Sequence, residues 1–175
     1  NNNMRKLTKI NDDFLAPLSL ATVEKFTSKS KDGALVSNLL FIPAGADKKK
    51  LPVVFYIHGG PVAQDDFGFD MTRQMLAANG YAVVAVNYRG SSGRGLAFCK
   101  SIYADWGNKE VQDILGASDY LTAKGITDPN KQAIGGWSYG GILTDYTIAT
   151  DTRFKAASSG AGSALQLAVY GVAQY

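Results

Sequence analysis

Short apolar runs that alternate with amphipathic stretches constrain the fold of this chain more than any other feature. Val53–Ile57 and Ala82–Val86 carry no charge and are rich in β-branched residues, as expected of strands buried on both faces of a sheet. The amphipathic stretch Phe69–Asn79 lies between them and stops at Gly80. The alternation then continues with candidate helices at Val111–Leu121 and Tyr139–Thr150 and candidate strands at Gln132–Trp137 and Phe154–Ser158. Repeats of this kind predict right-handed crossovers and a largely parallel sheet.

The first part of the chain has a different pattern. Val23–Thr27 and Leu35–Ile42 are strand candidates that flank Asp32-Gly33, a dipeptide typical of tight hairpin turns. We therefore expect an α/β fold in which an antiparallel N-terminal hairpin adjoins a mostly parallel sheet.

Glycines gather where the predicted parallel strands end. They are Gly59 and Gly60 after the first strand, Gly90, Gly93 and Gly95 after the second, and Gly135, Gly136, Gly140 and Gly141 around the third. Ligands of open α/β sheets bind at the carboxyl ends of the strands, and glycine allows the backbone to approach a ligand closely. The functional site is predicted at this edge of the sheet.

Cysteine and histidine each occur once, as Cys99 and His58. One cysteine cannot form a disulfide within the chain, and one of each cannot supply an ordinary structural zinc site. We therefore expect no metal. No cofactor is expected either, because Gly90–Gly95 has neither the Rossmann order of glycines nor a Walker lysine.

The net charge of +3 is concentrated near the N-terminus and does not indicate a nucleic-acid partner. Lys48–Lys50 is flanked by turn-forming residues, and no aromatic interleaving or recognition helix accompanies it. The segment Ala156–Tyr175 is uncharged, but its glycines, serines and glutamines are unsuited to a bilayer helix. We expect a soluble protein without a membrane partner, while the choice between cytoplasm and a secreted or periplasmic location stays open.

The strongest chemical signal is Gly136-Trp137-Ser138-Tyr139-Gly140, a G-x-S-x-G between a predicted strand and a predicted helix. In a nucleophile elbow the serine occupies a strained turn, and the flanking glycines prevent clashes where the backbone folds tightly. The sequence therefore predicts Ser138 as the nucleophile. The competing interpretation is a tight turn with an incidental serine.

A second signal, His58-Gly59-Gly60-Pro61, follows the first buried strand. In such folds this loop donates one backbone N–H to an oxyanion hole, and the residue after the nucleophile donates another. Gly60 and Tyr139 are the candidate donors, each typically worth about 3 kcal/mol of transition-state stabilisation.

Together these segments resemble the catalytic domain of the prolyl oligopeptidase family of serine peptidases, in particular its acylaminoacyl-peptidase-like and dipeptidyl-peptidase-like branches. The other matching segments are Ser30–Gly33, Asn87–Gly93, Asp105–Gly107 and Arg153–Ala157. The resemblance implies an α/β-hydrolase fold and hydrolysis of short peptides through an acyl-enzyme on Ser138. It also implies that residues 1–19 are a linker leaving a β-propeller and that 20–175 are part of the catalytic domain.

The chain departs from this family in one respect. A hydrolase triad runs serine, acid, histidine along the chain, yet no histidine follows Ser138. The acids that do follow, Asp145 and Asp151, are interpreted as solvated helix positions, and His58 as a residue that steers Gly60, with the role of base as its alternative. We therefore predict that the triad acid and histidine are not in this chain and that the C-terminal strands of the domain are missing.

Two other functions remain open from the sequence. A carboxylesterase or lipase of the same fold needs the same nucleophile and oxyanion hole. A fragment without its base could also be a non-catalytic binding module, since a serine without its histidine is a poor nucleophile. We expect the isolated chain to be nearly inactive and its partners to be a short peptide, the remaining part of the domain and a β-propeller.

Overall fold

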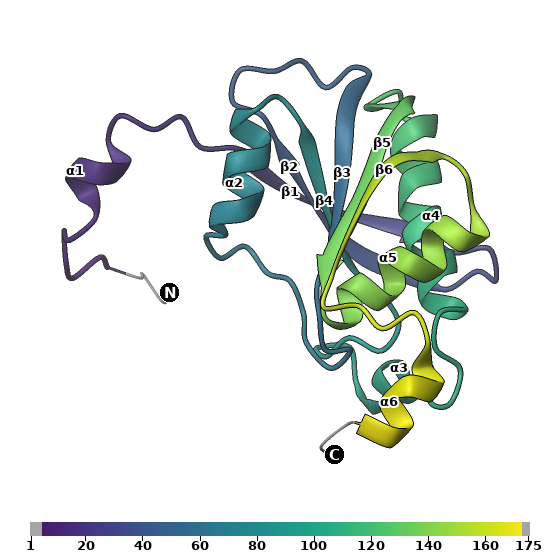
Figure 1. Ribbon diagram of the computed structural model, residues 1–175. Helices are drawn as coiled ribbons and strands as arrows, with labels where there is room; N and C mark the ends of the chain where they lie inside the picture. The colour runs from purple at the N-terminus through teal and green to yellow at the C-terminus, as the bar shows by residue number, and fades with distance from the viewer. Residues whose placement is uncertain (1–4, 173–175) are drawn as a thin grey trace.

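A single six-stranded sheet organises the computed structural model, which describes residues 5–172 (Figure 1). Its strands lie in the order β1-β2-β4-β3-β5-β6. Their bounds are Thr22–Lys29 for β1, Leu35–Ile42 for β2, Leu51–Ile57 for β3, Ala82–Asn87 for β4, Thr127–Trp137 for β5 and Phe154–Gly160 for β6.

The pairing directions confirm the mixed sheet expected from the sequence. Strand β2 pairs antiparallel with β1 and with β4, whereas β3 is parallel to β4 and β5, and β5 is parallel to β6. The turn at Asp32-Gly33 closes the hairpin, and Gly33 has the positive φ of 92° that glycine adopts without strain. The predicted hairpin and parallel strands are both present.

Helices cover both faces of the sheet (Figure 1). Helix α2 (Met71–Ala78) packs on one face, against β2 and β4, whereas α4 (Lys109–Ala123) and α5 (Tyr139–Thr150) pack on the other. All three were predicted. The short helices α1 (Asp12–Leu15), α3 (Leu96–Lys100) and α6 (Gln166–Val172) were not.

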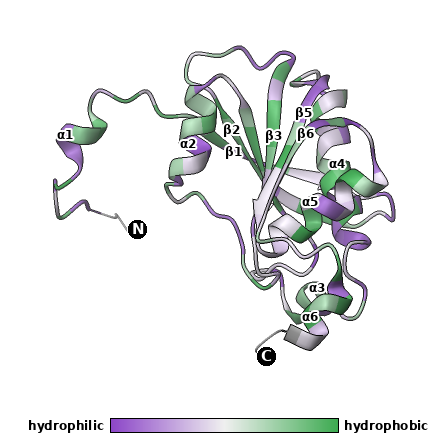
Figure 2. Ribbon diagram, in the orientation of Figure 1, coloured by the Kyte–Doolittle hydropathy of each residue, from purple (hydrophilic) through white to green (hydrophobic). Residues whose placement is uncertain are grey.

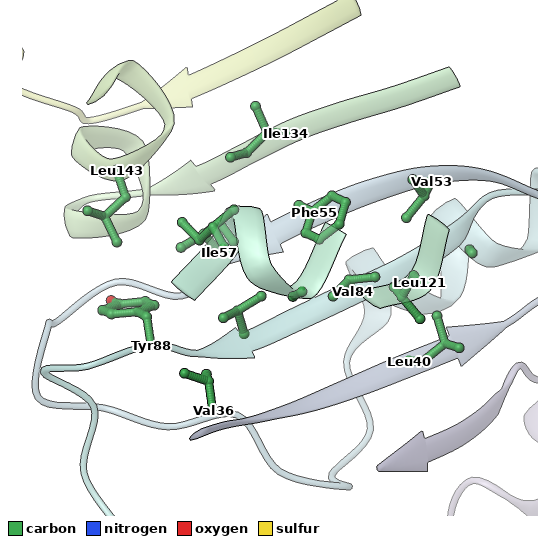
Figure 3. Packing of buried hydrophobic residues seen from close by; sticks show 14 of the residues in the cluster. Val36, Leu40, Val53, Phe55, Ile57, Val84, Tyr88, Leu121, Ile134 and Leu143 are labelled. Atoms are coloured by element: carbon green, nitrogen blue, oxygen red, sulfur yellow. The ribbon is translucent and has the colours of Figure 1, made fainter. Parts of the chain in front are cut away.

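The two faces of the sheet have separate cores, because successive side chains of a strand point in opposite directions. The larger core joins Val84, Phe55 and Leu40 of the strands to Leu121 of α4 and Leu143 of α5 (Figure 3). The smaller core, under α2, is formed by Leu39, Phe41, Val83 and Ala85. The hydrophobic colouring of the central strands in Figure 2 reflects this burial on both faces.

The strands that follow β3 in the sequence are added first on one side of it and then on the other, and this order positions the site. After β3 it passes through α2 to β4 on one side, then returns through α4 to β5 on the other. The carboxyl ends of β3 and β5 therefore lie at a topological switch point, where ligands of open α/β sheets bind.

Strand β6 lies at the edge of the sheet and is poorly covered. Its five central residues are exposed. A hollow of about 410 Å³ lies beside β6 and extends over β5 and β3. Its walls include Tyr56, Leu76, Ala133, Trp137, Ala156 and Ser158. Within the described residues, no strand pairs with the free side of β6.

Residues 5–21 precede the sheet as a mostly exposed segment that contains only α1 (Figure 1). Their role as a linker, and the division at residue 20, stay predictions. None of the helices in residues 5–172 has the length and apolar character needed to cross a bilayer. The last three residues of the uncharged C-terminal segment lie outside the described part.

Candidate active site

Ser138 occupies a strained turn between β5 and α5. Its φ of 57° and ψ of −122° belong to a region that L-residues rarely adopt, and such a conformation costs about 1–3 kcal/mol. The side chain is exposed at the carboxyl end of the sheet, where the sequence predicted the nucleophile.

The glycines on either side of Ser138 are required by close backbone contacts. A Cβ atom on Gly140 would lie 2.1 Å from the Ile57 carbonyl oxygen, and one on Gly136 would lie 2.5 Å from the same oxygen. The end of β3 therefore presses directly against the turn. Any larger residue at either position would push the elbow away from β3.

The loop after β3 lies beside the nucleophile. A Cβ atom on Gly59 would be 3.3 Å from the Ser138 Cβ and 3.9 Å from its Oγ. Gly60 follows with a φ of 133°, a conformation suited to glycine. The structure thus brings the predicted loop and the predicted nucleophile together.

Tyr139 opens helix α5, so its backbone N–H is one of the first-turn donors that lack an intrahelical acceptor. The positive end of the helix dipole favours negative charge at this place. The Tyr139 side chain points inward, with 2% of its surface exposed, and its hydroxyl donates to Glu110.

His58 is held by neighbours on both ring nitrogens. Its Nδ1 lies 2.7 Å from the Gly59 carbonyl oxygen and its Nε2 lies 2.9 Å from the Ser91 hydroxyl. Burial lowers the pKa of His58, and the Asp65 carboxylate opposes this effect. These contacts agree with the interpretation of His58 as a residue that orients the glycine loop.

The two acids after the nucleophile differ from the prediction that they are solvated. Asp145 is half-buried and accepts a hydrogen bond from Ser159 at 3.1 Å. Asp151 is half-buried and forms an ion pair of 2.9 Å with Arg153, which holds the pKa of Asp151 below its usual value. The Asp145 contact arises because α5 packs on β6, whereas the Asp151 pair is local, with a partner two residues further along the chain.

Three side chains behind the site had no assigned role in the sequence analysis. Tyr88 stacks on His58 with ring centroids 4.4 Å apart, and Trp106 packs edge-on against Tyr139 at 5.1 Å. Glu110 accepts from Tyr139. Only tertiary contacts join these residues, so spacing along the chain could not have identified them.

An open, mostly apolar pocket of about 750 Å³ adjoins the glycine loop. Pro61 and Val62 of the loop, residues of α3, Trp106 and Tyr146 all contribute to its walls. Within residues 5–172, no group of three or more His, Cys, Asp or Glu side chains is arranged to hold a metal ion.

Comparison with known proteins connects this geometry to a family. The sequence profile of the prolyl oligopeptidase family matches residues 67–173. The chain is 34% identical over 155 residues to an uncharacterized peptidase, YuxL, of Bacillus subtilis, covering 87% of this chain and 24% of that protein. It is 36% identical over 122 residues to dipeptidyl aminopeptidase BIII of Pseudoxanthomonas mexicana, covering 66% and 18%.

A solved structure shows the same fold. Acylaminoacyl peptidase of Pyrococcus horikoshii superposes with a TM-score of 0.87 at 31% identity, covering 95% of this chain and 27% of that one. The chain thus spans about a quarter of the length of these relatives or less. The profile match extends over more than half of the chain, and the chain belongs to the prolyl oligopeptidase family of peptidases.

Proposed function

We propose that this chain is part of a serine peptidase that cleaves short peptides through an acyl-enzyme on Ser138. The observation that carries the proposal is the exposed Ser138 in its strained turn, with the backbone of Gly59 beside its side chain. Membership of a peptidase family supports the choice of amide over ester substrates.

The proposed reaction has two stages, formation of the acyl-enzyme and its hydrolysis. The Ser138 Oγ attacks the scissile carbonyl carbon and loses its proton to a base, while the N–H groups of Gly60 and Tyr139 stabilise the oxyanion. The C–N bond then breaks, the amine leaves with a proton, and water hydrolyses the resulting ester. Such backbone donors act where charge develops in the transition state.

The base and its orienting acid are proposed to come from outside these 175 residues. The only histidine of the chain, His58, has both ring nitrogens occupied, and Asp145 and Asp151 are each engaged elsewhere. The uncovered β6 edge and its adjoining hollow offer a surface for the remaining part of the domain. Residues 1–19 are proposed as the connection to a β-propeller.

The apolar pocket beside the glycine loop is proposed to receive a hydrophobic side chain of the peptide. Pro61 in its wall directly follows Gly60 in the chain, so the pocket lies next to a proposed oxyanion donor. A similar acylaminoacyl peptidase, with a TM-score of 0.88 at 30% identity, was solved with Z-Gly-Gly-Phe-chloromethyl ketone. We expect substrates with an apolar residue before the cleaved bond.

The test compares aminoacyl nitroanilides with nitrophenyl esters on the full-length parent polypeptide. We expect amide hydrolysis, and a loss of more than about 10⁴-fold in kcat for Ser138→Ala. Thr27→Ala removes an exposed hydroxyl of β1, at the opposite edge of the sheet, and is the matched control that should keep wild-type rates. Activity confined to esters would reject the peptidase proposal in favour of an esterase.

A second experiment tests the external base. The 175-residue chain, verified by intact mass, is treated with a fluorophosphonate. We expect labelling of Ser138 to be slower by about 10³-fold or more than in the parent protein, because a serine without its base is a poor nucleophile. Labelling at the parent rate would contradict the proposal.

A further inference from the structure

Glu110, in the first turn of α4, is the carboxylate that bonds to the Tyr139 hydroxyl. The Tyr139 hydroxyl donates to the Glu110 Oε1, and the Gly107 N–H donates to the same oxygen at 3.3 Å. Glu110 is 0% exposed. The residue whose backbone N–H is the proposed oxyanion donor is thus anchored through its side chain to another helix.

The segment just before α4 packs against α5 close to the Tyr139–Glu110 hydrogen bond. Trp106 packs edge-on against the Tyr139 ring. Gly107, with a φ of 79°, lies so close to Tyr146 that a Cβ atom there would be 2.4 Å from the ring. The first two turns of α5 are therefore held from the side by one short stretch of chain.

The other oxyanion donor is connected to the same group of side chains. Tyr88 lies between Tyr139, at 6.0 Å between ring centroids, and His58, at 4.4 Å. The Tyr88 hydroxyl donates to the His58 carbonyl oxygen at 2.8 Å, one peptide before Gly59. The stacked rings of His58, Tyr88 and Tyr139 thus connect the glycine loop to α5. Glu110 accepts a hydrogen bond from the last of these rings, Tyr139.

Burying the carboxyl group of Glu110 lowers the stability of the fold. Its Oε2 is buried without a hydrogen-bond partner, and a buried unpaired polar atom costs about 1–3 kcal/mol. Burial also raises the pKa of Glu110. An apolar side chain would avoid these costs but would leave the buried Tyr139 hydroxyl without its acceptor, so the contribution of Glu110 lies in the bond that holds Tyr139.

We propose that Glu110 is a positioning residue of the oxyanion hole. By holding the Tyr139 phenol it fixes the start of α5, and with it the direction of the Tyr139 backbone N–H. The inference rests on the proposed function, because it assigns Glu110 a part in stabilising the oxyanion of that reaction.

Kinetics of the full-length parent polypeptide test the proposal with an aminoacyl nitroanilide. Glu110→Ala and Tyr139→Phe should each lower kcat by roughly 10- to 100-fold, less than the 10²- to 10³-fold that follows loss of a whole donor. KM should stay within about twofold, since the contact acts in the transition state. Glu110→Gln keeps an acceptor for the phenol and should restore kcat to within about threefold of wild type.

A double variant and a matched control separate positioning from folding. Glu110→Ala combined with Tyr139→Phe should lose no more than either single change, because both remove the same bond. Thr147→Val removes a buried, unpaired hydroxyl on the same helix and should leave kcat unchanged. Unchanged kcat in both single variants, a rise in KM alone, or additive losses would overturn the proposal.

Crystal structures of the Glu110→Ala and Glu110→Gln proteins give a readout that needs no activity. We expect the Tyr139 ring and backbone nitrogen to shift in the alanine variant and to keep their places in the glutamine variant. An unmoved Tyr139 nitrogen in the alanine variant would overturn the positioning role. A wild-type protein without amidase or esterase activity would instead contradict the proposed function, and the structures would still decide the placement.

Discussion

At the scale of single residues, the elbow is set by how closely two backbones approach. Gly140 has no room for a side chain, since its Cβ position is 2.1 Å from the Ile57 carbonyl oxygen and 3.0 Å from that of His58. Both neighbours are backbone atoms, which cannot rotate away as a flexible side chain would. The strained serine conformation therefore persists because β3 and α5 over-determine it.

Gly140→Ala should destabilise the protein by roughly 3 kcal/mol, because the added methyl forces the start of α5 away from β3. The same displacement should lower the reactivity of Ser138 toward a fluorophosphonate. Urea denaturation and labelling rates measure the two effects. Gly171→Ala is the control, because no atom lies within 4 Å of a Cβ there, and equal stability of the two variants would contradict the explanation.

Glu110 should make stability depend on pH. Burial raises the pKa of this carboxyl, so the folded protein binds its proton more tightly than the unfolded chain does. Its contribution to the free energy of unfolding is therefore greatest at acidic pH and falls as pH rises from the ordinary value through the raised one. The glutamine in Glu110→Gln cannot ionise, so this variant does not lose stability at position 110 as pH rises.

The prediction is that Glu110→Gln gains stability relative to wild type as pH rises from about 4 to 7. Urea denaturation at several pH values gives the difference directly. Glu24→Gln is a suitable control because Glu24 is exposed and paired with Lys48 on the surface. A constant difference between Glu110→Gln and wild type across this range would show that the carboxyl titrates normally.

At the scale of elements, the strands and long helices could be predicted because burial on both faces of the sheet forces apolar runs. Val53–Ile57 and Ala82–Val86 lie inside β3 and β4. The short helix α3 could not be predicted, because it follows three positive-φ glycines and is tied to the loop by the Gly90 N–H bonding the Phe98 carbonyl oxygen. Contacts of that kind leave no periodic signal.

The residues of the candidate site also differ in whether the sequence could predict them. Ser138, Gly60 and Tyr139 could be proposed from local motifs, because a tight turn and a close backbone approach demand particular residue types. Glu110 and Tyr88 could not, since their positions follow from how α4 and β4 pack beside α5. The groups proposed to touch the substrate could thus be predicted from local motifs, whereas the side chains that support them could not.

Two ion pairs of Arg89 join three parts of the chain. Arg89, after β4, bonds through its side chain and its backbone N–H to Asp113 of α4, with a shortest side-chain distance of 2.8 Å. It also pairs with Asp32 in the hairpin turn. Asp113 is 0% exposed, and the two pairs hold the hairpin, the loop after β4 and α4 together.

Arg89→Ala should destabilise the protein by about 3–5 kcal/mol, because it leaves the Asp113 carboxylate buried without its partner. Lys48→Ala breaks a pair that is about half exposed, Lys48–Glu24, and should cost at most about 1 kcal/mol. Thermal or urea denaturation of both variants gives the comparison. Similar losses for the two would show that Asp113 finds another partner.

At the scale of the whole molecule, the central strands are covered on both faces, whereas β6 at the edge contacts α5 but stays largely exposed. Helices α2, α4 and α5 cover β2, β3 and β4, and the site lies at the carboxyl ends of β3 and β5. Beyond β5 the sheet ends in β6, whose five central residues are exposed and whose neighbouring hollow has mainly apolar walls. An open edge of this kind favours pairing with another strand.

This edge should make the isolated 175-residue chain self-associate. Ala156→Lys places a charge on exposed β6, and charged side chains on edge strands oppose pairing between edges. The sedimentation coefficient should rise with concentration for the wild-type chain and stay constant for Ala156→Lys. Ala123→Lys makes the same exchange at an exposed position of α4 and should sediment like wild type. Concentration-independent sedimentation of the wild-type chain would contradict association through β6.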